Sequence, residues 1–363
     1  MNLLTLKHTN MKKILFATVA ALAITSCSQN EEIDAPAQKT PVSFKTIVNK
    51  SARATAMLEA DFSEFKVYAY NTGTDNIATA TAIGTAFING EEVTKAAEGA
   101  WGMSTTHYWP VSDNIQFFAF SPKAAISTDL WNVTTKYPSF TYTIKEVASQ
   151  EDLLVASATD KTKPTTDQAI ELAFSHILTQ INFSAKLVKN FAYTITGISI
   201  KGVNNKNTYS YDSGWGTSEG TADYAYDGNW NAAPEGDDNI ANLSKTTDTK
   251  ITNALMLMPQ TLPSTAKIEI TYSVKAPDNT TITFNGTKEV SLSGTWEKNK
   301  NIRYILELPT DAKEVKLTPK VNTSIPTESK PAIKACSSIC PEMRVSRATR
   351  TRGCLPSACC VST

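Results

Sequence analysis

Cysteine is nearly absent from the body of this sequence. All six cysteines lie toward its two ends, and none occurs between Cys27 and Cys336. Any fold formed by the intervening residues therefore stands without disulfide bonds.

Motifs that would mark a catalytic or cofactor site are also scarce. Of three histidines, only His107 and His176 follow the signal segment described below. Their aromatic and apolar surroundings favour packed structural histidines, although each is also a candidate base for a hydrolase. The chain has no P-loop and no Gly-x-Gly-x-x-Gly sequence. We therefore expect a protein that is not an enzyme and has neither a cofactor nor a metal site.

The chain has no excess of either charge. Lysine and arginine number 35, as do aspartate and glutamate, so the formal net charge is zero. This balance gives no basic surface for nucleic acid, and we expect no nucleic-acid partner. A hydrophobic content of 41%, including 9% aromatic residues, is enough to form buried cores.

The beginning of the chain has the pattern of an export signal. Lys12 and Lys13 precede a short apolar run, Ile14–Ile24, which is too short to span a bilayer. No other apolar run is long enough to span one. Cys27 follows small residues and resembles the lipobox cysteine of bacterial lipoproteins, which carries acyl chains that hold a protein to a membrane. We predict residues 1–27 as a lipoprotein signal with its true start at Met11; the alternative is a plain signal peptide with an incidental cysteine.

Composition then divides the remaining chain into four parts. Residues 28–40 are polar and acidic and read as a flexible tether. The polar stretch before residue 167 predicts a boundary between two domains, 41–166 and 167–325. Residues 326–363 hold five cysteines and several arginines, a composition foreign to the rest, and we expect this tail to lie outside the fold.

Period-two alternation predicts an all-β protein. Ile268, Ile270, Tyr272 and Val274 alternate with polar residues, as they would on a half-buried strand. The same reading predicts strands at 65–70, 115–120, 140–144 and 302–308. Within 282–290, the Asn285-Gly286 pair predicts a hairpin of two strands. We expect two β-sandwich domains.

The apolar face changes parity between Leu172 and Leu187. It lies on even-numbered residues such as Phe174 and then on odd-numbered ones such as Phe183. A strand changes face only at a bulge, at a bend or on moving to another sheet, so one of these three must occur here.

The stretch Val203–Leu243 is rich in Asn, Gly, Asp and Ser and predicts a long irregular loop. Trp215 and Trp230 lie on it. Their rings could stack on sugars as a ligand site, or fold back on the sandwich as aromatic plugs.

Several short segments occur in a characteristic order along the chain. They are the lipobox at 24–27, Ser51-Ala52-Arg53-Ala54-Thr55, Tyr108-Trp109-Pro110 leading into 115–122, 150–156, Phe174-Ser175-His176, 180–183, 253–260 and Trp296-Glu297-Lys298-Asn299-Lys300 leading to Tyr304. Their order along residues 11 to 320 gives the chain a resemblance to the fimbrillin family of Bacteroidales pilus subunits. It implies two transthyretin-like β-sandwich domains in tandem, lipid-dependent export to the outer membrane and cell surface, and a structural subunit of fimbriae that supports adhesion.

The resemblance also implies assembly by strand exchange after proteolysis, with other fimbrial subunits as partners. We expect the cut between Arg53 and Ala54, which would release the apolar segment 41–49. The donor strand would come from the other end, where four apolar side chains share one face: Val315, Leu317, Val321 and Ile325. The alternative is a surface lipoprotein that does not polymerise and binds glycans or host ligands.

Overall fold

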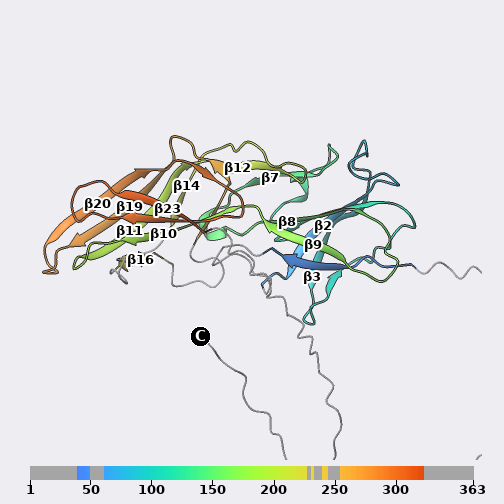
Figure 1. Cartoon of the computed structure of the whole chain (residues 1–363), viewed down its shortest axis with the longest axis horizontal. Helices are drawn as coiled ribbons and strands as arrows, with labels where there is room; N and C mark the ends of the chain where they lie inside the picture. The colour runs from blue at the N-terminus through green and yellow to red at the C-terminus, as the bar shows by residue number, and fades with distance from the viewer. Residues whose placement is uncertain (1–38, 50–60, 227–229, 233–238, 244–253, 323–363) are drawn as a thin grey trace, which may run out of the picture. The chain divides into compact units, whose positions relative to one another are not determined.

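A computed structural model describes residues 39–49, 61–226, 230–232, 239–243 and 254–322 of the chain (Figure 1). These residues form β-strands and no α-helix; two short 3-10 turns, η1 (Thr128–Leu130) and η2 (Val147–Ser149), are the only helical elements among them. The predicted all-β fold class is therefore confirmed.

Contacts divide the described residues into two compact units, each made of several chain segments. Unit 1 comprises those within 1–47, 63–140 and 155–174, and unit 2 comprises those within 48–62, 141–154 and 175–363. The linear domain boundaries expected from composition stay a prediction.

A seven-stranded sheet has the strand order β1-β9-β8-β5-β2-β3-β4. Its strands are β1 (Phe44–Val48), β2 (Glu64–Asn71), β3 (Thr85–Lys95), β4 (Trp101–Met103), β5 (Ile115–Ser121), β8 (Leu154–Lys161) and β9 (Ile170–His176). All seven residues of the central strand β5 are buried, which explains why it lacks the alternation of a half-exposed strand and carries four consecutive apolar residues, 117–120. β2 and β5 match the strands predicted at 65–70 and 115–120.

Two five-stranded sheets belong to unit 2. The first has the order β16-β10-β22-β23, with β17 also paired to β10; the second has the order β14-β11-β19-β20, with β15 also paired to β11. The strands of the first sheet are β10 (Thr179–Lys186), β16 (Ile240–Asn242), β17 (Leu255–Leu257), β22 (Asn301–Glu307) and β23 (Lys316–Asn322). Those of the second are β11 (Ala192–Val203), β14 (Ala222–Tyr226), β15 (Trp230–Ala232), β19 (Lys267–Lys275) and β20 (Ile282–Ser291).

Two smaller sheets complete the described strands. One has the order β13-β12-β7-β6, and the other pairs β18 with β21. Their bounds are β6 (Trp131–Asn132), β7 (Ser139–Thr143), β12 (Lys206–Ser210), β13 (Gly214–Trp215), β18 (Gln260–Thr261) and β21 (Thr295–Trp296). The loop predicted over 203–243 was wrong, because five short strands, β12 to β16, lie within it. Each is too short, and too closely bounded by Gly and Asn, for alternation to reveal it.

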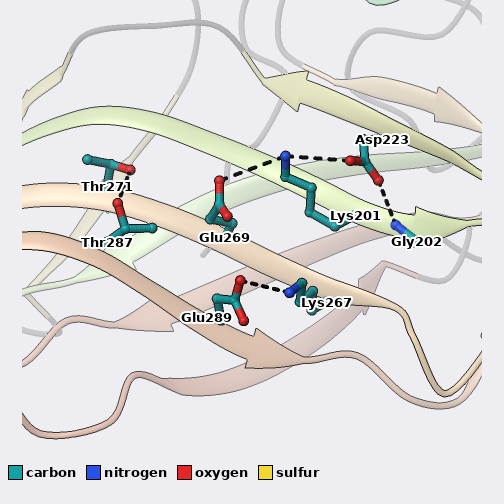
Figure 2. Close-up of polar contacts among 8 residues, drawn as sticks. All are labelled: Lys201, Gly202, Asp223, Lys267, Glu269, Thr271, Thr287 and Glu289. Carbon is teal, nitrogen blue, oxygen red and sulfur yellow. Dashed lines mark hydrogen bonds and ion pairs between the residues drawn. The ribbon is translucent and has the colours of Figure 1, made fainter.

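The second five-stranded sheet keeps its apolar and polar residues on opposite faces. Along β19, Ile268, Ile270, Tyr272 and Val274 are at most 1% exposed, as the alternation predicted. The other face carries hydroxyls and ion pairs that link β14, β11, β19 and β20 (Figure 2). This face therefore meets solvent, while the apolar face contributes to the core of unit 2.

The hairpin predicted at Asn285-Gly286 was wrong. β20 runs without a break through this pair, with Asn285 opposite Ser273 and Gly286 opposite Tyr272. The turn lies earlier, between β19 and β20, where Asn279 has a positive φ of 60°.

The change of apolar face has a clear cause. β9 belongs to the seven-stranded sheet and β10 to a sheet of unit 2, so the chain changes sheet between His176 and Thr179. Of the three predicted causes, the move to another sheet is the one that occurs.

Candidate functional site

β1 is the terminal strand of the seven-stranded sheet, next to β9. Val42, Phe44 and Val48 are only 5–6% exposed. The ring of Phe44 meets those of Phe65 and Phe117 edge to face, with centroids 5.7 and 5.9 Å apart. Val42 and Phe44 of this edge segment are thus an integral part of the unit 1 core.

Backbone hydrogen bonds hold the same segment. Ile170 N–H donates to the Ser43 carbonyl at 2.8 Å, and Val42 N–H donates to the His107 carbonyl at 2.8 Å. Trp109 N–H donates to the carbonyl of Thr40 at 3.0 Å. Removal of this segment would leave these groups of unit 1 without their partners and uncover an apolar face, two features that recruit another strand.

β23, which carries two of the four predicted donor residues, is also an edge strand. It pairs antiparallel with β22 at the end of its five-stranded sheet. Val315, just before it, is 6% exposed, Leu317 is half-buried and Val321 is 49% exposed. Ile325 lies outside the described residues. The apolar face of β23 is therefore only partly covered within its own chain.

Cys27, the predicted lipid attachment residue, and the Arg53–Ala54 bond, the predicted cleavage site, lie outside the described residues.

The two tryptophans predicted as a ligand loop are half-buried and packed on their own chain. Trp215 Nε1–H donates to the Ile177 carbonyl at 2.6 Å, and its ring lies edge to face with Tyr209, 5.2 Å between centroids. Trp230 stacks on Tyr226 at 5.7 Å. β13 positions the first and β15 the second.

His176 forms a buried pair with Asp152. Both side chains are 1% exposed, and His176 Nδ1 lies 2.7 Å from Asp152 Oδ2. Burial raises the pKa of the neighbouring Tyr142, and the charges of Glu151 and Asp152 raise it further. A closed pair of this kind offers no substrate access, which favours a structural role. The sequence anticipated the burial of His176 but missed its partner.

His107 lies beside a carboxylate in unit 1. Its Nε2 is 3.7 Å from Glu91 Oε1, and the other oxygen of Glu91 accepts a hydrogen bond from Ser104 Oγ at 3.0 Å. The carboxylate thus stands between the hydroxyl and the imidazole. A histidine that activates a serine must contact the hydroxyl itself, so this arrangement is not that of a nucleophile and its base.

Residues 216–220 fit the spacing Gly-x-Ser-x-Gly, a pattern typical of serine hydrolases. Ser218 Oγ donates to the Pro259 carbonyl at 3.2 Å and accepts from Asn207 Nδ2 at 3.0 Å. The hydroxyl is therefore engaged by groups other than histidine. The chain continues into the strand β14 rather than into the helix that a nucleophile elbow requires.

The described residues lack two further features. They contain no group of three or more His, Cys, Asp or Glu side chains placed to hold a metal ion. None of their elements is a helix with the length and hydrophobicity needed to cross a membrane.

Comparison with known proteins gives consistent matches. The sequence model of the fimbrillin-like family matches residues 52–325. A relative from Phocaeicola vulgatus, fimbrium subunit Fim1C, is 27% identical over 232 residues, which span 55% of this chain and 60% of that protein's length. The fold is similar to the crystal structure of a fimbrial protein from Bacteroides vulgatus, with a TM-score of 0.58, 20% identity and coverage of 78% of this chain and 98% of that one.

Proposed function

Because the chain belongs to the fimbrillin-like family, we propose that it is a structural subunit of cell-surface fimbriae that supports adhesion. In this proposal it is exported as a lipoprotein acylated on Cys27 and held at the outer membrane. A cut after Arg53 then removes the N-terminal segment. The edge strand of another fimbrial subunit takes the place of β1.

The observation that carries this proposal is the contrast between the two edge strands. β1 presents apolar side chains that are almost fully buried, whereas β23 presents apolar side chains that its own chain covers only in part. Both strands carry their apolar residues at alternate positions, so a strand with the pattern of β23 can fill a groove shaped for β1.

The free energy gained by burying the apolar face of the β1 segment is large enough to drive assembly. Burying Val42, Phe44 and Val48 contributes about 1.5–3 kcal/mol each, or together about 5–9 kcal/mol before ordering costs. An empty groove would expose this apolar surface to water. A donor strand with Leu317 and Val321 inserted would bury it again and would also cover side chains that are half exposed in the single chain.

Limited digestion of the purified full-length precursor with an arginine-specific protease tests the proposal. We expect mass spectrometry to find a released fragment that runs from an acylated Cys27 to Arg53. Size-exclusion chromatography with light scattering should then show a ladder of oligomers. Arg53→Ala should prevent both results.

Two variants of the strand itself provide the control. Leu317→Asp should be cut normally but should not form oligomers, because a charge cannot enter the apolar groove. Thr318→Asp changes the next residue, which is exposed on the opposite face of β23, and should still assemble. A cleaved protein that stays monomeric at high concentration with β23 intact would refute strand exchange.

A further inference from the structure

Among the described strands, β20 is a long one at the edge of its sheet. It is the terminal strand of its sheet, spans ten residues and has no buried side chain. Ile282 at its start is 59% exposed. An edge of this length presents a row of unpaired N–H and C=O groups, which invites pairing with the strand of another molecule.

The side chain of Lys288 points to the interior face of this edge. Lys288 lies opposite Ile270, which is fully buried. Its neighbours Thr287 and Glu289 point to the solvent face, where they reach Thr271 at 2.9 Å and Lys267 at 2.7 Å, respectively (Figure 2). A lysine at an apolar-face position of an edge strand breaks the alternation that the sheet otherwise keeps.

Contacts from unit 2 hold this ammonium group in place. Lys288 Nζ donates to the Ala312 carbonyl at 2.5 Å and lies 5.1 Å from the centre of the Phe284 ring. The side chain is half-buried, so water still reaches it. A strand added alongside β20 would cover Lys288 with its own side chains and strip that water from a charge, which is costly.

β23, the free edge of the other five-stranded sheet, carries a different obstacle. Pro319 lies opposite Tyr304, and the pairing of β22 with β23 continues on both sides of it without a register shift. Proline has no N–H to donate, so an unbroken ladder requires its nitrogen to face away from β22. The outer edge of β23 therefore lacks one donor and carries a ring where a neighbouring strand would lie.

We propose that Lys288 and Pro319 close these two edges of unit 2 to strands from a second copy of this chain. Inward-pointing charges and edge prolines are two of the devices by which sheet proteins avoid edge-to-edge pairing. The proposal stands on the geometry of β20 and β23 alone. Its consequence, that copies join at the edge filled by β1 rather than at these two edges, rests on the proposed function.

The experiment uses the full-length chain carrying Arg53→Ala, which blocks the cleavage that strand exchange would need. In this background we compare Lys288→Val, Pro319→Val and the double variant by light scattering over a concentration series. We expect the parent to stay monomeric and the double variant to reach about twice the monomer mass or more, because both edges are then free to pair. Hydrogen exchange should show new protection of β20 or β23 amides in the associated material.

Matched controls separate edge pairing from a general gain in hydrophobicity. Lys267→Val places the same change on β19, an interior strand whose backbone groups are already paired, and should stay monomeric. Thr318→Val introduces a valine beside Pro319 and should likewise stay monomeric. Lys288→Arg keeps the charge and should also stay monomeric, while Lys288→Met keeps the length of the stem and should associate even if Lys288→Val fails to fold.

Two outcomes would overturn the proposal. One is a folded double variant that remains monomeric across the series. The other is association of Lys267→Val to the same extent as Lys288→Val, which would show that the edge position is irrelevant. Neither outcome bears on strand exchange at β1, since no cleavage occurs in this background.

Discussion

The imidazole of His176 is only 1% exposed, and it faces a carboxylate rather than an apolar group. Buried polar groups are costly unless each finds a partner, so His176 and Asp152 depend on one another. We predict that His176→Ala lowers the free energy of unfolding by about 1–3 kcal/mol, because it removes a partner of a buried acceptor. Urea denaturation measures this loss.

His107→Ala is the matched control for that prediction. Its Nε2 has no hydrogen-bond partner among the described residues and stands 3.7 Å from Glu91 Oε1. We therefore expect a clearly smaller loss of stability than for His176→Ala. Equal losses in the two variants, or an unchanged His176→Ala protein, would show that the pair with Asp152 contributes nothing.

The sequence could predict that His176 is buried but not what it contacts. Its sequence neighbours Phe174 and Leu178 are apolar, and that local pattern can be read from the sequence. Asp152 lies 24 residues earlier, and the fold alone brings the two together. Lys288 was missed for a related reason: an inward lysine is recognisable only once the opposite residue, Ile270, is known to be buried.

At the scale of elements, the turn between β19 and β20 is held by one carboxylate. Asp278 accepts hydrogen bonds from the Thr281 hydroxyl and from the N–H groups of Thr281 and Thr280. These bonds, the hydroxyl first, lower the pKa of Asp278 to about 2. They stabilise the ionised form, so their contribution to folding is fully present above the unfolded pKa, about 3.9.

That contribution is lost as the pH falls through the folded pKa of Asp278, about 2. We predict an NMR titration midpoint for the Asp278 carboxyl carbon near this value. Thr281→Val removes the hydroxyl and should raise the midpoint toward the ordinary range. A wild-type midpoint near about 3.9 would mean that the carboxylate does not hold the turn in solution.

The same turn explains why the hairpin was placed wrongly from the sequence. Asn285-Gly286 is the stronger local signal for a two-residue turn, yet Pro277, Asp278 and Asn279 form the actual one. In β20, Gly286 lies opposite the large ring of Tyr272, which packs at a tilt against the ring of Phe284 with 4.6 Å between centroids. Packing across the sheet thus overrides local turn preference, and that packing cannot be read from the sequence.

At the scale of the whole chain, strands with regular alternation were predictable and the order of strands in the sheets was not. Alternation placed β19 and β22 correctly because each has one buried and one exposed face. It could not show that β1 and β23 both end their sheets, because an edge is defined by the strand that is missing beside it. The alternation of the predicted donor segment could therefore be read from the sequence, and its partial exposure could not.

Electron microscopy of material sheared from cells, probed with an antibody against unit 2, tests the central claim most directly. The account predicts filaments labelled along their length, and none from cells whose chain carries both Arg53→Ala and Leu317→Asp. If wild-type filaments carry no label while the antibody marks only the membrane fraction, the chain is a surface lipoprotein and not a subunit of the fibre.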